Sequence, residues 1–311
     1  PLVSGTIADH TMLPTSNIGG LHPHHSWPTA VLSPPCRNPR GSRSGPAGLA
    51  CLAMNAHRSD AADSSLPLTG ERTVPGLPVE NYWFRRHEVA YRRCVDICAG
   101  HDVLEAGCGE GYGADLIASV ARRVVAVDYD AATVAHVGAR YPRVEVLAAN
   151  LASLPVPDSS VDVVVNFQVI EHLWDQPQFI TECLRVLRPG GSLLMSTPNR
   201  ITFTPDSDTP VNPFHTRELN AAELRTLLTD GGFVVRSMSG VFHGPRLINM
   251  DSRHGGSIIN AQIVRALAGT PWPDDLLADV AAVSCADFDI VDDSGREIDE
   301  SLDLLAIAVR P

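Results

Sequence analysis

One stretch of the chain combines an acid with regularly spaced glycines. Glu105 ends a short apolar run, and Gly107, Gly109 and Gly111 follow it at alternate positions. This pattern is typical of a strand that breaks into a tight turn, because glycine accepts backbone conformations that other residues avoid. A ligand can lie against the bare backbone of such a turn where the next helix begins.

The spacing of the glycines limits which ligand this is. The dinucleotide-binding pattern is G-x-G-x-x-G. Counted from Gly107, its third glycine would fall at position 112, which is Tyr112. The chain reads E-x-G-x-G-x-G instead, and this disfavours a nicotinamide-dependent dehydrogenase.

Further polar residues stand where apolar runs end. Asp128 ends the run that starts at Val124, and Asn150 follows the run 144–147. An acid about 20 residues after a glycine turn can accept hydrogen bonds from both hydroxyls of a ribose. The side-chain oxygen of Asn150 could accept a proton of an adenine amino group. The sequence therefore favours a nucleoside-containing ligand.

A third group of residues could move a proton. Gln168, Glu171 and His172 follow the apolar run 161–167, and His215 lies in a later loop. Histidine suits general-base catalysis, since its ordinary pKa lies near neutral pH. His172 or His215 could be the base, with Glu171 orienting it or the substrate, and a site without a dedicated base stays open.

Strand and helix signals alternate through the part of the chain that carries these residues. Continuous apolar runs such as 161–167 are typical of strands buried on both faces. Alternation with helical segments predicts an α/β fold with a mostly parallel sheet. Ligands bind such sheets outside the carboxyl ends of the strands, which is where the polar residues above fall.

Composition restricts the class of protein further. The 311-residue chain has a formal net charge of −12, and all 24 of its basic residues are arginine. An acidic chain without a basic cluster argues against nucleic acid as a partner. No apolar run approaches the roughly 18 residues of a membrane span. The seven cysteines have no disulfide or metal spacing, which suggests reduced thiols in the cytoplasm.

The beginning of the chain differs in composition from the rest. Residues 1–65 are rich in Pro, Ser, Gly and His without hydrophobic periodicity, which predicts a disordered segment. Residues 1–53 are interpreted as not native, since Met54 is a plausible start. The organised domain is expected to span residues 66–311.

Residues 102–197 resemble the core of the class I methyltransferases that use S-adenosylmethionine (SAM). The glycine turn, Asp128 and three later motifs carry this resemblance: LPVPDSSVD at 154–162, VIEH at 169–172 and RVLRPGG at 185–191. It implies a Rossmann-like, mostly parallel seven-stranded sheet with helices on both faces and a small helical insertion before the last strand. SAM-binding residues are then expected at Glu105, Gly107, Cys108, Gly109, Gly111, Asp128, Tyr129, Asn150, Leu151 and Gln168.

Each part of SAM has an expected partner in this set. By resemblance, Glu105 and the turn hold the methionine part, Asp128 the ribose, and Asn150 with Leu151 the adenine. Relatives usually carry Asp at the adenine position, so Asn150 keeps the acceptor oxygen and loses the charge. We expect weaker SAM affinity from that difference.

Outside the core the chain resembles mycobacterial methyltransferases assigned to methylglucose lipopolysaccharide synthesis. The segments NPFHTREL at 212–219 and FHGPRL at 242–247 carry this likeness, and LTGERTVP at 68–75 resembles methyltransferases found with glycan-building enzymes. It implies methylation of glucosyl hydroxyls, at O6, on an oligosaccharide or polysaccharide acceptor. The alternatives are another small hydroxylated or quinone-like acceptor, and a SAM-binding regulator without turnover.

Some methyltransferases of hydroxyl groups hold Mg²⁺ with Glu-x-x-Glu-His and a distant His. Here Glu171, His172 and His215 match, but Gln168 replaces the first acid. Because Mg²⁺ prefers hard oxygen ligands, the loss of this carboxylate makes a metal possible but not favoured.

The segment 240–291 is longer than a minimal methyltransferase requires. We interpret it as a candidate acceptor-binding cap in which Trp272 stacks on a sugar and Arg246 or Arg253 binds hydroxyls. Dimerisation or simple packing is the alternative role, and the oligomeric state stays open.

Overall fold

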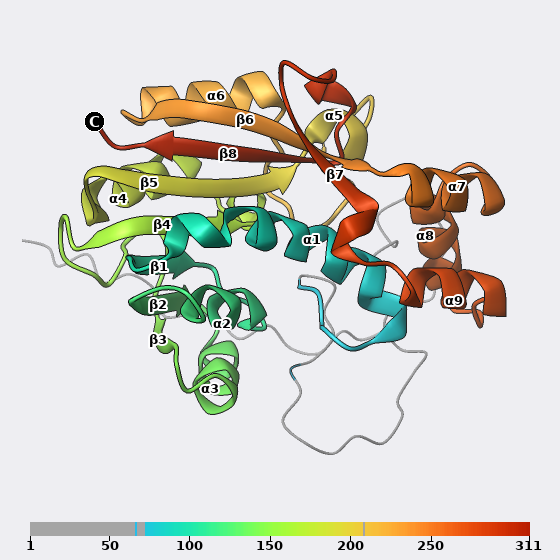
Figure 1. Cartoon of the computed structure of the whole chain (residues 1–311), viewed down its shortest axis with the longest axis horizontal. Coiled ribbons are helices and arrows are strands. Elements are labelled where there is room, and N and C mark those ends of the chain that lie inside the picture. The colour runs from blue at the N-terminus through green and yellow to red at the C-terminus, as the bar shows by residue number, and fades with distance from the viewer. Residues whose placement is uncertain (1–65, 67–71, 208) are drawn as a thin grey trace, which may run out of the picture. The chain divides into compact units, whose positions relative to one another are not determined.

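A computed structural model describes residues 66, 72–207 and 209–311. The predictions made for residues 1–65, and for the first part of the segment 68–75, lie outside these described residues. The α/β organisation expected for residues 66–311 is found throughout the described part (Figure 1).

Eight strands form one sheet in the described part of the chain, in the order β3-β2-β1-β4-β5-β8-β6-β7. Their bounds are β1 (Asp102–Ala106), β2 (Arg123–Asp128), β3 (Glu145–Ala148), β4 (Val161–Phe167), β5 (Leu187–Pro198), β6 (Val234–His243), β7 (Phe288–Asp292) and β8 (Asp303–Val309). Strands β1 to β5 pair in parallel, whereas β8 lies antiparallel between β5 and β6. The expected Rossmann-like sheet is confirmed, and its predicted strand number of seven is corrected to eight.

The additional strand, β7, comes from the segment that the sequence analysis assigned to the insertion. It pairs with the outer edge of β6. Its sequence FDIVD is only five residues long, begins and ends beside acids and is half-exposed, so it gives a weak strand signal. Pairing with β6, and not local propensity, makes this segment a strand.

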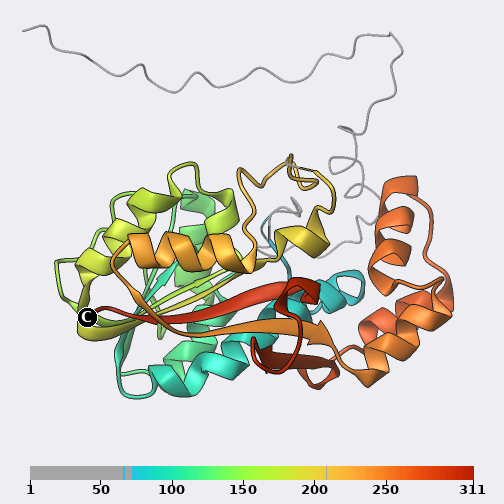
Figure 2. The same cartoon turned by 90° about the horizontal axis from the view of Figure 1, so that it is seen from above.

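Helices cover both faces of the sheet (Figure 2). Their bounds are α1 (Asn81–Cys94), α2 (Tyr112–Ala118), α3 (Ala131–Arg140), α4 (Gln176–Val186), α5 (Arg200–Phe203), α6 (Ala221–Asp230), α7 (Pro245–Arg253), α8 (Ile258–Ala268) and α9 (Asp274–Ala281). One core cluster joins α4 and α6 to one face, and a second joins α1, α2 and α3 to the other. The run VDVVVNF of β4 is apolar along its length because both of its faces are covered.

A buried ion pair fixes helix α1 to strand β8 of the sheet. The guanidinium of Arg86 donates to both carboxylate oxygens of Asp303, each at 2.7 Å. Both side chains are almost fully buried, so each charge depends on the other for its compensation. Because Asp303 begins β8, this pair holds α1 beside the carboxyl ends of β5 and β6.

The segment between β6 and β7 forms α7, α8 and α9, with a separate apolar cluster. Strand β6 runs parallel to β5, since both are antiparallel to β8. Helix α7 therefore begins at the edge where the parallel strands end, and Figure 1 shows the three helices beyond that edge. Among the residues that the model describes, no helix combines the length and apolarity needed to cross a bilayer.

Candidate active site

The glycine turn follows β1 directly and leads into α2. Gly107 has a φ of 87°, and Gly111, which precedes α2, has a φ of 80°. A β-carbon at Gly107 would lie 2.7 Å from the side-chain methyl carbons of Val169. Close packing and left-handed backbone thus both require glycine at this point.

Glu105 is fully buried beside this turn and has one unused oxygen. The Tyr91 hydroxyl of α1 donates to its Oε1 at 2.7 Å. Among the described residues, no group bonds to its buried Oε2. Burial raises the pKa of Glu105 to about 8. A cationic donor placed at Oε2 would satisfy this oxygen and favour the carboxylate.

Asp128 ends β2 beside the glycine turn. Its Oδ2 accepts from the Gly109 backbone N–H at 3.0 Å, and its Oδ1 accepts from that of Asp130 at 3.1 Å. Each carboxylate oxygen keeps a second lone pair, so a ribose diol could still bind. The neighbouring Tyr129 is largely exposed, at 71%.

The other predicted cofactor residues differ in how they could contribute. Asn150 lies two residues past β3, and its Oδ1 accepts from the Ala152 N–H at 2.9 Å. Leu151 is buried in the core, and the Cys108 side chain is buried in the second core cluster. Cys108 would therefore meet a ligand through its backbone.

Gln168 lies immediately after β4 in a left-handed conformation, with a φ of 57°. Its N–H donates to the Ser196 carbonyl at 2.9 Å, and its Nε2 donates to the Ser196 hydroxyl at 3.3 Å. The side-chain amide of Gln168 is thus held against Ser196 of β5. Such backbone strain in a residue other than glycine is concentrated at functional sites.

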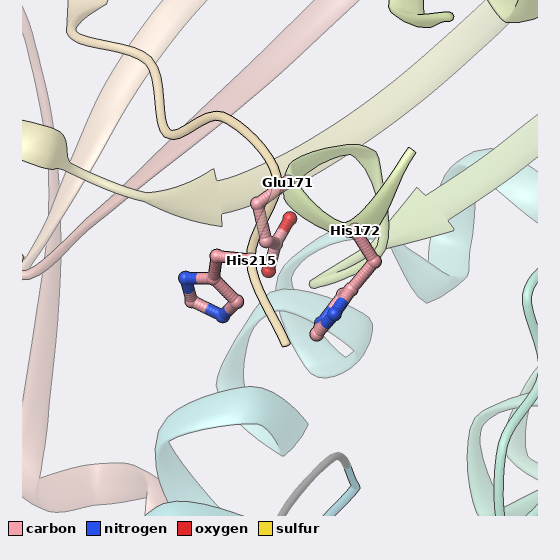
Figure 3. Close-up of side chains that lie close together, drawn as sticks. All are labelled: Glu171, His172 and His215. Carbon is pink, nitrogen blue, oxygen red and sulfur yellow. The ribbon is translucent and has the colours of Figure 1, made fainter. Parts of the chain in front are cut away.

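Glu171, His172 and His215 form a cluster at the carboxyl edge of the sheet (Figure 3). The first two belong to a short 3₁₀ helix, Ile170–His172, and the third to the loop before α6. Their potential ligand atoms all lie within 4.8 Å of one another, and Figure 3 shows the Glu171 carboxylate beside both rings. The structure brings together the three residues that the sequence singled out for proton transfer.

The two histidines differ in the atoms they leave available. His172 Nδ1 lies 3.0 Å from the Phe214 carbonyl oxygen. A carbonyl only accepts, so Nδ1 carries the proton and Nε2 keeps its lone pair. His215 donates from Nδ1 to Glu218 at 2.7 Å, and its Nε2 accepts from the Asn212 amide at 3.0 Å. His172 is thus the better placed of the two to accept a proton.

Burial changes the protonation of this cluster. It raises the pKa of Glu171, which accepts from the Thr197 hydroxyl at 3.0 Å, to about 7. Burial, with the nearby His215, lowers the pKa of His172 to about 4. At neutral pH His172 is therefore uncharged and Glu171 is close to its midpoint.

Several residues at this site were not among the predicted site residues. Glu218 orients His215, and Thr197 orients Glu171. His87 of α1 lies within electrostatic range of both site histidines, and burial lowers its pKa to about 4. Trp174, two residues after His172, is 92% exposed. In the sequence, a tryptophan two residues after the Glu-His pair is the signal that could have drawn attention to this position.

The residues expected to bind the acceptor from the cap have partners of their own. Trp272 packs against the cluster of the α7–α9 region. Arg246 pairs with Asp287 at 2.7 Å, and Arg253 pairs with Asp279 at 2.9 Å. Both guanidinium groups are therefore already bound within the cap.

Comparison with known proteins identifies the class. A family model described as a methyltransferase domain matches residues 104–195. A probable SAM-dependent methyltransferase of Mycolicibacterium smegmatis is 70% identical over 252 residues, which cover 81% of this chain and 98% of the relative. One of Mycobacterium tuberculosis is 69% identical over 254 residues, covering 81% and 93%. The chain belongs to the SAM-dependent methyltransferases.

Solved structures agree on the fold. A SAM-dependent methyltransferase of Thermotoga maritima superposes with a TM-score of 0.51 at 16% identity, covering 74% of this chain and 93% of that one. The names of the mycobacterial relatives specify SAM and neither an acceptor nor a metal. The Mg²⁺ hypothesis gains no support from them.

The residues present fit SAM. The unpartnered Oε2 of Glu105 suits the ammonium group of the methionine part, and Asp128 can accept from the ribose. The glycine turn follows Glu105 in the chain, and its Gly109 N–H donates to Asp128, so the turn lies beside both acids. The cofactor residues and the proton-transfer cluster lie at the same edge of the sheet.

Proposed function

We propose that the protein methylates a sugar hydroxyl, with SAM as donor and His172 as general base. The observation that carries this proposal is the position of His172 Nε2, which has no hydrogen bond to any described residue, at the carboxyl edge of the sheet. The acceptor we propose is a glucosyl O6 of a methylglucose lipopolysaccharide precursor. The segment 212–219, which supplies part of that resemblance, contributes His215 and Glu218 to this site.

When bound, SAM supplies a methyl group on a positively charged sulfur. His172 Nε2 accepts the hydroxyl proton as the oxygen forms its new bond to carbon, and the thioether leaves. Glu171 as a carboxylate stabilises the imidazolium that results, because an opposite charge nearby favours the protonated ring. His215, held by Glu218 and Asn212, packs its ring edge-to-face with that of His172 at 4.8 Å and fixes its orientation.

The exposed side chain of Trp174 supports a saccharide acceptor. Its ring follows the 3₁₀ helix that carries the base and is almost entirely open to solvent. An aromatic face can cover the apolar face of a sugar ring while the ring hydroxyls bind polar groups. Trp174 therefore replaces Trp272 in our proposal as the residue that stacks on the acceptor.

Mg²⁺ is not part of the proposed mechanism. Glu171, His172 and His215 could bind a cation together, but they offer one carboxylate and two imidazoles. Mg²⁺ prefers oxygen ligands, and Gln168, in the place of a further acid, bonds to Ser196.

An acceptor screen tests the proposed function. Wild-type protein with methyl-labelled SAM should transfer label to methyl α-glucoside and to α-1,4-glucan oligomers. A catechol and a quinol serve as the competing class of hydroxylated acceptors. Transfer to the quinol with none to any saccharide would overturn the proposal and leave the methyltransferase class intact.

The protonation of Glu171 predicts a pH profile. Its pKa, raised from 4.5 to about 7, leaves the carboxyl neutral below pH 7 and charged above it. The value of kcat/KM should therefore rise with pH through a midpoint at about 7 and level off roughly one pH unit higher, since only the carboxylate supports His172 as base. In Glu171→Gln the rise should disappear. An unchanged rise in this variant would assign the titration to another group.

A further inference from the structure

A polar pocket adjoins the proton-transfer cluster and has no role in the mechanism above. It has a volume of about 180 Å³, and its lining includes Arg200, Thr204, Thr216, Arg217, Glu218 and Glu223. A cavity needs about 10–15 Å³ of such volume to hold one water, and this pocket exceeds that size more than tenfold. It can therefore admit a group much larger than a single water.

Two wall residues bind directly to the proton-transfer cluster. Glu218 accepts from His215 Nδ1 at 2.7 Å. The Thr216 hydroxyl lies 3.1 Å from the Glu171 carbonyl oxygen and 2.7 Å from that of Leu173, which precedes Trp174. Thr216 thus connects the wall of the pocket to the backbone on both sides of His172, next to Trp174.

The lining holds hydrogen-bonding groups that no described residue satisfies. Glu218 is 3% exposed, and its Oε2 has no partner among the described residues. Buried side-chain oxygens usually have a hydrogen-bond partner in the protein or in an ordered water. The side chain of Arg217 is exposed, and the described residues give it no hydrogen bond or ion pair. Arg200 Nε lies 3.4 Å from Glu223 Oε2. This ion pair is long, and a ligand could replace it.

The charges of the lining indicate the chemistry of the ligand. Two arginines face two glutamates, so the lining is balanced in charge and a carboxylate or phosphate would meet Glu218 and Glu223 unfavourably. A ring with adjacent hydroxyls suits the set, because each hydroxyl both donates and accepts. It can donate to the carboxylates and accept from the guanidinium groups.

We propose that this pocket is a second acceptor subsite, which holds a sugar unit neighbouring the one that is methylated. This inference rests on the proposed function, since it takes the acceptor to be a saccharide. It predicts that the enzyme prefers an oligosaccharide to a single glucosyl unit. Glu218 also links occupancy of the subsite to the orientation of His215.

Arg217→Ala tests the subsite. We expect wild-type protein to favour maltotetraose over methyl α-glucoside in kcat/KM, and the variant to lose about tenfold of this preference, which corresponds to one direct contact. Arg236→Ala, which changes another exposed arginine, in β6, is the matched control and should keep the wild-type ratio. Binding of maltotetraose, followed by saturation-transfer NMR, should weaken in parallel in Arg217→Ala.

The outcomes separate the two proposals. If wild-type protein methylates both saccharides and Arg217→Ala keeps the same ratio, the subsite is wrong and the proposed function stands. If it methylates no saccharide, the proposed function fails and the subsite fails with it. Inorganic phosphate that displaces maltotetraose in the wild-type protein but not in Arg217→Ala would overturn the neutral-sugar assignment in favour of an anion site.

Discussion

Replacing Gly107 with alanine is expected to raise the Kd for SAM at least about 100-fold, or about 2.7 kcal/mol. The left-handed backbone at this position, with φ 87°, costs a residue with a β-carbon roughly 1–2 kcal/mol. The added β-carbon would also lie 2.7 Å from the methyl groups of Val169. The turn must therefore move, and it carries the backbone that lies between Glu105 and Asp128.

Gly190→Ala provides a matched control for this effect. Gly190 has a similar φ of 81°, but a β-carbon there meets nothing within 4 Å. Both variants place a β-carbon on left-handed backbone and are strained in the same way, but only Gly107→Ala also displaces the turn. Calorimetric titration with SAM measures both. Equal affinities in the two variants would show that SAM does not depend on the turn at Gly107.

Replacing His172 with alanine is expected to lower kcat roughly 10²–10⁴-fold, the usual contribution of a positioned general base. SAM affinity should stay within about twofold, because Glu105 and Asp128 are unchanged. Single-turnover transfer of labelled methyl, with SAM binding measured on the same sample, reports both quantities. His172→Ala should thus lose most of the methyl-transfer rate while its affinity for SAM stays close to that of the wild-type protein.

His101→Ala is the control for loss of a histidine. His101 precedes β1, at the opposite edge of the sheet, and its side chain is 51% exposed. It should keep wild-type turnover. Full turnover in His172→Ala would remove that residue from the mechanism and favour a site without a dedicated base. Absence of turnover in wild-type protein with every acceptor, despite SAM binding, would favour a SAM-binding regulator.

The cofactor half of the site could be read from the sequence because it is local. Glu105 and Asp128 stand at the carboxyl ends of β1 and β2, and the glycine turn follows β1 directly. Parallel pairing of β1 with β2 and β4 then brings those strand ends to one edge. An apolar run and the polar residue that ends it are both visible in the sequence, so position along the chain predicts position in space.

The acceptor half depends on contacts between distant segments. Thr216 bonds to the Glu171 carbonyl and the His215 ring packs on that of His172, and both contacts span more than 40 residues. No periodicity encodes these contacts, so the adjoining pocket was not predicted. The pairing of His215 with Glu218, only three residues apart, was missed because it lies in a loop without periodicity. Arg246 and Arg253 were predicted to bind hydroxyls, but acids of the cap, distant in sequence, pair with both.

Helix α1 connects the two halves. Tyr91 donates to Glu105 in the cofactor region, and His87, one turn earlier, is influenced by His172 and His215. The pair of Arg86 with Asp303 holds the helix in this position. Its place across both halves depends on that buried ion pair between residues far apart in the sequence.

The most direct test of the account is to locate the methyl group that the enzyme transfers. Wild-type protein and His172→Ala are incubated with ¹³C-methyl SAM and unmethylated or partly methylated α-1,4-glucan oligomers, and the products are examined by NMR. The account predicts a new O-methyl signal on a glucosyl O6 with wild-type protein, reduced roughly 10²–10⁴-fold with the variant. A ¹³C-methyl signal that forms equally with both proteins, or no transfer to any glucan, would contradict it.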